Sequence, residues 1–177
     1  MESSVDRVPD YLAPIAGARS WRMAPTLLAK MNGILWSATM THQWKDGEEQ
    51  VAECSRHSHP APAKGCTCGI YGWYTPELMH ANGYGPTDFQ HVSGVVAGAG
   101  RVYRGERGYW VAERVRVYAF FDDGFASPME EVSEGSGVYL PTKEEAARIY
   151  DVDIIKYSEY EDFCSDRGLI VRKGGIA

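Results

Sequence analysis

The chain has 177 residues, of which 44% are hydrophobic and 12% aromatic, and it carries a formal net charge of −6. This length and composition predict one domain with a substantial core. No apolar run approaches the roughly 20 residues that a membrane-spanning helix needs, so we expect no membrane partner. The N-terminus is polar and acidic, without the apolar stretch of a secretory signal, which makes the cytoplasm the expected location.

Charge is distributed unevenly along the chain. Residues 120–170 contain thirteen acidic and four basic side chains, whereas residues 1–119 contain eleven acidic and twelve basic ones. An acidic C-terminal third disfavours nonspecific binding to DNA phosphates through that region. Its carboxylates either keep the surface solvated or face a basic partner.

The first third of the chain predicts an arm followed by the start of a sheet. Residues 1–17 contain two prolines and end on a glycine, so we expect an irregular arm before a single α+β domain over 18–177. The run 33–40 is rich in β-forming residues and predicts a strand. The polar residues 45–49 that follow predict a turn.

A loop and a short helix are predicted next. Residues 52–71 contain the prolines and glycines of a loop that folds back on itself, and the run 69–74 is again typical of a strand. Thr75 as N-cap, Pro76 at the first helical position and Gly83 as terminator predict a helix of about two turns between them.

The middle of the chain has the clearest β pattern. The runs 91–103 and 109–121 flank the loop R-G-E-R-G and predict a hairpin. Alternation puts five apolar residues of the second run on one face: Val111, Val115, Val117, Ala119 and Phe121. Glycines on one face of the first run predict a bulge, strong bending or the close approach of another backbone, at Gly94, Gly98 and Gly100.

The last third predicts short elements after an exposed connection over 122–140. Thr142 and Glu145 have the spacing of a capping box, which predicts the start of a helix. Its inward stripe is expected to contain Ala146, Ile149 and Tyr150. Three elements are predicted downstream: a strand over 151–157, a helix over 159–166 and a strand over 169–171. Together the patterns predict an α+β fold with a curved, mainly antiparallel sheet and a few short helices.

Three cysteines and a histidine within fifteen residues form the most informative motif. Thiolates and a neutral imidazole are a natural closed ligand set for tetrahedral zinc. The predicted metal ligands are Cys54, His59, Cys66 and Cys68. His57 competes for the histidine position, and His59 is favoured because prolines stiffen the chain just after it. The fourth cysteine, Cys164, lies far away in a predicted helix and is expected to be a small buried residue.

The motif predicts a structural zinc rather than a catalytic one. A catalytic site needs an open coordination position and a nearby acid, and the zinc-enzyme motifs H-E-x-x-H and H-x-E with C-x-x-C are missing from the sequence. The nucleophile elbow G-x-S-x-G and the phosphate-binding P-loop are missing too. Two alternatives stay open: a metal-free loop with buried thiols, and a catalytic thiol at Cys54 or Cys66.

The predicted hairpin provides an alternative binding site. Arginines near a loop tip reach phosphates while aromatic rings stack on bases, which predicts contact with a nucleic acid. The residues concerned are Arg101, Arg104, Arg107, Tyr109, Trp110, Arg114 and Arg116. The solvent-facing side of a sheet has a similar composition. The five tryptophans of the chain are expected mainly in the core, although Trp, Tyr and Arg also anchor protein interfaces.

The order of these motifs resembles an uncharacterised family of small actinobacterial and actinophage proteins. The resemblance is specific at the loop and extends loosely over residues 19–121. It rests on Arg19 and Trp21, on Ala52 and Cys54, and on the run H-P-A-P-A-K-G-C-T-C-G-I-Y over 59–71. It implies an actinobacterial or phage setting, but no reaction and no catalytic residues.

Together these observations predict a non-enzymatic regulatory or host-interaction protein with a structural zinc site, which acts by binding another protein. A nucleic-acid-binding regulatory protein that uses the arginine hairpin is the alternative. A small zinc- or thiol-dependent enzyme is the third hypothesis. The sequence leaves the oligomeric state open.

Overall fold

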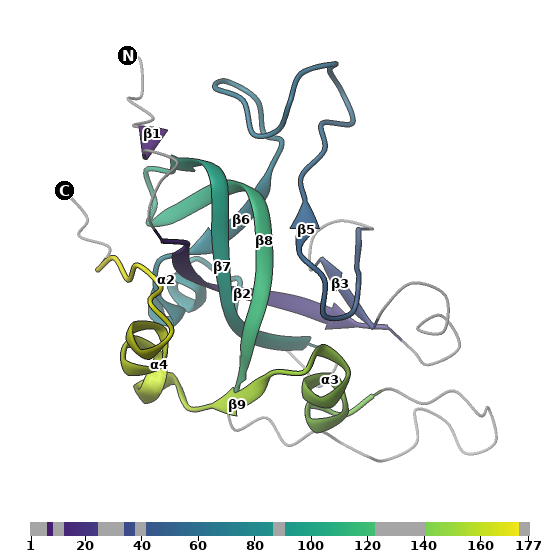
Figure 1. Ribbon diagram of the computed structural model, residues 1–177, viewed down its shortest axis with the longest axis vertical. Coiled ribbons are helices and arrows are strands. Elements are labelled where there is room, and N and C mark those ends of the chain that lie inside the picture. The colour runs from purple at the N-terminus through teal and green to yellow at the C-terminus, as the bar shows by residue number, and fades with distance from the viewer. Residues whose placement is uncertain are drawn as a thin grey trace.

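Two long antiparallel strands, β7 and β8, run through the centre of the fold (Figure 1). The computed structural model describes residues 7–8, 13–24, 34–37, 42–86, 91–122 and 141–173. The strands are β1 (Arg7–Val8), β2 (Ile15–Met23), β3 (Leu35–Ser37), β4 (Gln43–Trp44), β5 (Gln50–Val51), β6 (Ile70–Trp73), β7 (His91–Arg104), β8 (Tyr109–Phe121) and β9 (Asp153–Ile155). The helices are α2 (Pro76–Ala81), α3 (Lys143–Tyr150), α4 (Tyr160–Asp166) and the 3₁₀ turn η1 (Tyr157–Glu159). The fold is mixed α+β with a mainly antiparallel sheet, as predicted.

Four of the strands close into a ring. β2 pairs with β7 from Ile15 to Arg22, and on its other edge it pairs with β6 at Ala18. β6 and β7 both pair with β8, which completes the circuit. β3 and β4 extend the sheet from β2, and β1 extends it from β7. The sheet is therefore curved, as predicted, to the point that four of its strands form a closed ring. Each of these strands has a partner on both edges.

The indole of Trp110, on β8, fills the inside of this ring. The side chain is completely buried, and its Nε1 donates a hydrogen bond of 3.0 Å to the carbonyl oxygen of Ala16 on β2. Three glycines from the three other strands of the ring face the indole. A Cβ atom at Gly17, Gly72 or Gly98 would lie 2.6, 2.3 or 2.6 Å from the nearest indole atom. Only residues without a side chain fit at these positions.

The β7–β8 hairpin is confirmed, but its apolar residues do not share one face. Val115 and Val117 lie in the same core cluster as Trp110, whereas Ala119 and Phe121 lie in a second cluster on the other side. The pairing register between β7 and β8 shifts twice, between Val95 and Val96 and between Ala99 and Val102. A shift of one residue exchanges the two faces of a strand, so strict alternation gives the wrong face on one side of it.

Glycines on β7 do mark a bulge and close backbone approach, as predicted. Gly100 has a φ angle of +75° and lies within the second register shift. A Cβ atom at Gly94 would lie 2.2 Å from the carbonyl oxygen of Ala119 on β8. Both positions favour glycine for backbone reasons, while Gly98 is required by Trp110.

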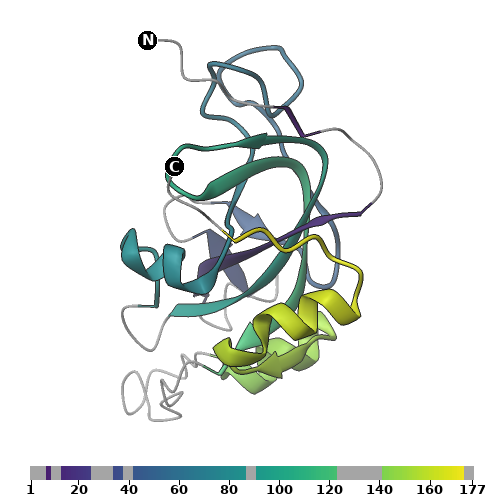
Figure 2. The same cartoon turned by 90° about the vertical axis from the view of Figure 1, so that its left-hand side faces the viewer.

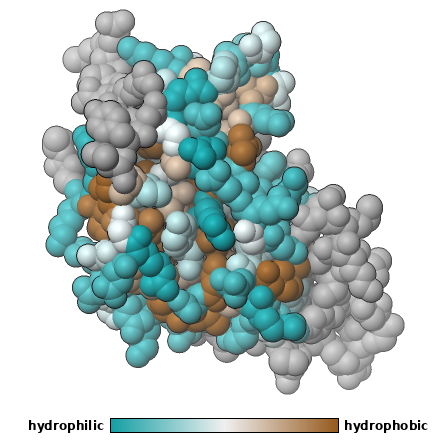
Figure 3. Space-filling view, viewed as in Figure 1, coloured by the Kyte–Doolittle hydropathy of each residue, from teal (hydrophilic) through white to brown (hydrophobic). Residues whose placement is uncertain are grey.

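The helices cover the two core clusters. Ala146, Ala147 and Tyr150 of α3 pack into the first cluster, and the Tyr150 hydroxyl donates to the carbonyl oxygen of Trp44 at 2.8 Å. Met79 of α2 and Phe163 of α4 pack into the second cluster. The helices α3 and α4 lie together at one end of the molecule (Figure 2). Hydrophilic residues cover much of the face seen in Figure 3, with smaller hydrophobic areas between them.

The local signals for helices are confirmed. Thr75 caps α2, with its hydroxyl accepting from the amide of Leu78, and Thr142 and Glu145 form the predicted capping box of α3. The inward stripe of α3 differs at one position, because Ile149 is 39% exposed and Ala147 is buried in its place. None of the helices in the described ranges is long and apolar enough to cross a bilayer.

Three predicted elements differ in the structure from their predicted form. The irregular arm does not reach residue 17, because β2 begins at Ile15, and Arg7–Val8 already pairs with β7. The strand predicted over 169–171 is a single bridge between Ile170 and Ile15. The strand at Asp153–Ile155 is present but runs parallel to β8. The turn over 45–49 is confirmed, and the connection predicted over 122–140 lies outside the described residues after Asp122.

We predict that Gly72→Ala destabilises the protein by about 2–4 kcal/mol, because the new methyl group overlaps the buried Trp110 ring. Gly168→Ala is the matched control, since Gly168 has a φ angle of +66° but no atom near its Cβ position. It is expected to cost only about 1 kcal/mol. Urea unfolding measures both. Equal losses for the two variants would show that Gly72 is not constrained by the indole.

Candidate functional site

The loop between β5 and β6 connects two strands that both pair with β8. Val51 of β5 is opposite Arg114 of β8, and Ile70 of β6 is opposite Ala112. The amide of Ala52 donates to the carbonyl oxygen of Glu113 between them, at 2.7 Å. β5 and β6 therefore follow one edge of β8, and the loop is an excursion whose two ends meet at Glu113.

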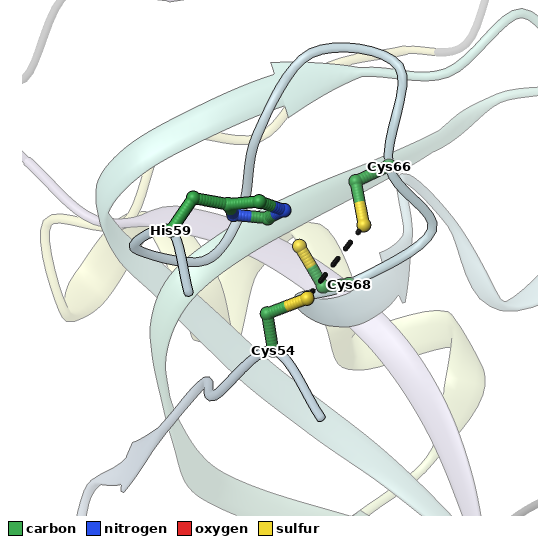
Figure 4. A group of neighbouring side chains, drawn as sticks. All are labelled: Cys54, His59, Cys66 and Cys68. Atoms are coloured by element: carbon green, nitrogen blue, oxygen red, sulfur yellow. Dashed lines mark hydrogen bonds between the residues drawn. The ribbon is translucent and has the colours of Figure 1, made fainter. Parts of the chain in front are cut away.

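The four predicted metal ligands come together inside this loop. One ligand atom from each of four residues lies within 4.8 Å of the others (Figure 4), and these residues are Cys54, His59, Cys66 and Cys68. Cys54 comes from the outgoing end of the loop, His59 from its middle, and the other two cysteines from its returning end. In Figure 4 the four side chains point toward one another.

The spacing of the donor atoms fits tetrahedral zinc. The sulfur atoms of Cys54 and Cys66 are 3.8 Å apart. Zn–S bonds of about 2.3 Å at tetrahedral angles require a sulfur–sulfur distance of roughly 3.8 Å. His59 Nδ1 lies 3.1 Å from the carbonyl oxygen of Pro60. A proton on Nδ1 can be donated to that carbonyl, which leaves the Nε2 lone pair free for a metal.

His57 does not enter the cluster. Its ring stacks on that of His59, with centroids 5.6 Å apart and 24° between the planes, and its side chain is exposed. The structure therefore brings His59 to the three thiols, and His57 covers the outer side of the imidazole.

The thiols of the cluster have divergent acidities. Burial acts to raise the pKa of Cys54, but hydrogen bonds from the backbone at Arg56 and His57 and from the neighbouring thiols outweigh it and lower this pKa to about 7. At Cys68, burial and the neighbouring Cys66 raise the pKa to about 11. A thiolate at one position disfavours a second beside it, so a divalent cation is needed to ionise the group as a whole.

Arg101 fastens the loop to the β7–β8 hairpin. Its Nε and its backbone amide both donate to Oε2 of Glu113, each at 3.2 Å, and a terminal nitrogen donates to the carbonyl oxygen of Ala61 at 3.2 Å. These hydrogen bonds and the guanidinium charge outweigh burial and lower the pKa of the Glu113 carboxyl. Within the loop itself, Ala61 is buried and Pro62 is fully buried. The loop is thus held on the sheet by contacts that do not involve the metal ligands.

The predicted nucleic-acid contacts are only partly available on the surface. Trp110 fills the ring of strands and cannot stack on a base, and Arg101 is committed to Glu113 and to the loop. Arg114 forms an exposed ion pair of 3.3 Å with Glu49. The exposed members that form no ion pair with a described residue are Arg104, Arg107 and Arg116. Tyr109 is half-buried.

A row of aromatic side chains, which the sequence reasoning did not identify as a unit, lies beside the loop. We call Tyr71, Tyr109, Trp73 and Tyr84, in this spatial order, the aromatic row. Successive ring centroids are 5.5, 5.7 and 5.3 Å apart. Tyr84 is 43% exposed and the others are half-buried. The alternation of Tyr71, Gly72 and Trp73 was a usable signal, because it puts two large rings on the face opposite a glycine.

Comparisons of the chain with protein-family models, with curated proteins and with solved structures found no match. The arguments on function therefore rest on the residues of this chain.

We predict that iodoacetamide at about pH 7.5 modifies Cys54 of the metal-free protein before Cys68 and Cys164, because the thiolate is the reactive form. Burial raises the pKa of Cys164 to about 12, while that of Cys54 is about 7. Peptide mass spectrometry measures the order. Added zinc is expected to protect the cluster and to leave Cys164 unchanged. Modification of Cys164 first would contradict the environments described above.

We predict that Arg101→Ala destabilises the protein by about 1–2 kcal/mol, because it removes the two side-chain hydrogen bonds, to Glu113 and to the carbonyl oxygen of Ala61. The Glu113 carboxylate then keeps the backbone amide of residue 101 as a donor but loses the guanidinium charge beside it. Arg114→Ala is the matched control on the same hairpin. Its ion pair is exposed, so the expected loss is below about 1 kcal/mol. Denaturant unfolding at constant zinc concentration compares them, and a larger loss for Arg114→Ala would contradict the anchoring role.

Proposed function

We propose that the protein is a non-enzymatic, zinc-stabilised binding protein that recognises another protein, in a regulatory or host-interaction role. The observation that carries this proposal is the convergence of three thiol sulfurs and one imidazole nitrogen, from three separate parts of one loop, within 4.8 Å. A zinc ion held there by Cys54, His59, Cys66 and Cys68 has all four positions filled by protein. It has no open position for a substrate.

The zinc stabilises the loop by cross-linking its two ends and its middle. Backbone pairing with β8 fixes the loop at residues 52 and 70, at either end of the excursion. Without the metal, ordering of the chain between them depends on Arg101, on the buried Ala61–Pro62 segment and on a few turn contacts. Metal binding and folding of this segment are therefore expected to be coupled.

The aromatic row supports recognition of a protein partner. Tyrosine and tryptophan are among the residues that most often anchor protein interfaces, and arginine is a third. The row is continuous with the loop between β5 and β6, residues 52–69, which we call the metal loop, because the Tyr71 hydroxyl donates to the carbonyl oxygen of Thr67 at 2.8 Å. The likeness of this loop to the actinobacterial and actinophage family supports a partner in an actinobacterial host.

Recognition of a nucleic acid is the second candidate function. Arg104, Arg107 and Arg116, which are exposed and form no ion pair with a described residue, favour it, because arginines contact phosphates. A thiol-dependent reaction has less support. Cys54 lies against Cys66, and Nδ1 of His59 faces a carbonyl oxygen, so the structure offers no described thiol–imidazole hydrogen bond.

We predict that the purified protein contains one zinc ion per chain and that Cys66→Ser loses it. Loss of about 3 kcal/mol of structural stabilisation lowers the melting temperature of a chain of this size by about 6–12 °C. Metal analysis and thermal unfolding with and without chelator measure both effects. Cys164→Ser is the matched control and keeps the zinc. Zinc-free protein that a chelator does not destabilise would remove the metal from the proposal.

The partner class is tested separately by retention of lysate proteins and of immobilised DNA and RNA. Zinc-dependent retention of a protein supports the first function. Nucleic-acid retention that falls steeply with salt supports the second instead.

A further inference from the structure

The aromatic row lies on the outer surface because Trp110 lies inside. Neighbouring residues of a strand point to opposite faces. On β6, Gly72 faces the indole, so Tyr71 and Trp73 project outward. On β8, Tyr109 is next to Trp110 and directly opposite Trp73, so it projects outward beside that ring. The row is therefore a consequence of how the ring of strands is filled. Trp73 also packs against the second core cluster, while Tyr84 is 43% exposed.

The row is held at its Tyr71 end and in the middle, and its other end packs on the ring before it. The Tyr71 hydroxyl is bonded to the metal loop through Thr67. The Tyr109 ring lies against the backbone of Gly105, where a Cβ atom would come within 2.1 Å of it. Tyr84 packs on Trp73 at a centroid distance of 5.3 Å. Rigid aromatic side chains lose little conformational entropy on binding, which favours a recognition surface.

The angles between the rings favour an extended peptide over stacked bases. The planes of Trp73 and Tyr109 are 70° apart, and the two outer pairs are tilted by 42° and 37°. Bases stack on ring faces that are open, whereas here each ring presses on its neighbour. Polyproline II segments dock on surfaces lined by Tyr and Trp rings, and the row offers four such rings in succession. The three steps of 5.3–5.7 Å span about five residues of such a segment.

The charge next to the row is positive. Arg104 and Arg107 lie at the end of the hairpin, on either side of Gly105, against which the Tyr109 ring packs. Both are exposed, and neither forms an ion pair with a described residue. Glu106 between them leaves this loop with a net positive charge. An acidic residue of a partner would complement it and steer association.

From these contacts we infer that the aromatic row, together with Arg104 and Arg107, is a docking surface for an extended, proline-containing acidic peptide segment of a protein partner. This inference rests on the proposed protein-binding function and names the chemistry of the partner. The rings bind the apolar and proline residues of the segment, and the two arginines bind its carboxylates.

The test is a selection of random peptides of about twelve residues, displayed on phage, against the zinc-loaded protein. Enriched sequences are expected to contain proline together with aspartate or glutamate. Their synthetic versions are measured by fluorescence polarisation. Trp73→Ala and Tyr84→Ala are each expected to weaken binding about tenfold, the size of an interface hot spot. Tyr84 is the most exposed ring, so its variant keeps the test valid if Trp73→Ala does not fold.

Charge is tested with Arg107→Ala and with Arg116→Ala as the matched control on the same hairpin. Arg107→Ala is expected to weaken binding about threefold at a salt concentration of about 0.15 M and hardly at all at about 1 M. Arg116→Ala is expected to bind like the wild type. Peptides that bind Trp73→Ala and Tyr84→Ala as tightly as the wild type would overturn the inference, and so would a selection that enriches no sequence.

Labelled oligo(dT) tests the other class of partner on the same variants. Binding of oligo(dT) that depends on Trp73 or Tyr84 would overturn the peptide inference in favour of a nucleic acid. The proposed function fails differently. If a lysate protein is retained equally by the wild type and by Tyr84→Ala, protein binding stands and only the assignment to the aromatic row is wrong.

Discussion

The packing of one indole against three glycines determines the rest of this structure. Trp110 leaves space for no Cβ atom at Gly17, Gly72 or Gly98, and it also satisfies the carbonyl of Ala16 on the strand that closes the ring. Four strands can close this tightly only if one of them supplies a large side chain and the others supply none. A residue that fills the centre also fixes the direction of its neighbours. Because Trp110 points inward, Tyr109 and Val111 must point outward.

The metal loop and the aromatic row both depend on the outward direction of Val111 and Tyr109. Val111 supports the metal loop, since its side chain lies beneath Gly69, where a Cβ atom would come within 2.3 Å of it. Tyr109 joins the rings of β6 in the aromatic row. The metal loop and the row are thus adjacent parts of one outer face, joined through Tyr71 and Thr67. Zinc in the loop would hold one end of the row in place without touching a partner.

The sequence predicts what depends on neighbouring residues and misses what depends on closure of the ring. The caps of α2 and α3, the β7–β8 hairpin and the four clustered donors are each encoded within one continuous stretch of about thirty residues or fewer, so they were predicted correctly. Burial of Trp110 depends in part on Gly17, more than ninety positions away, and the alternative nucleic-acid site wrongly included Trp110 although tryptophans were expected mainly in the core. The contact between Arg101 and Ala61 was not predicted for the same reason, because Ala61 lies on a different loop. The register shifts of β8 are also invisible to strict alternation, because they are set by pairing with β7.

The loop that separates β5 from β6 along the edge of β8 has a consequence for how the sequence of such a protein can evolve. Because β5 and β6 occupy successive positions on that edge, the excursion between them can lengthen, shorten or be exchanged while the pairing on either side is preserved. The ring of strands would then stay constant among related proteins, while the loop varies. Related chains are expected to tolerate drift in loop length and ligand spacing far more readily than any side chain at Gly17, Gly72 or Gly98.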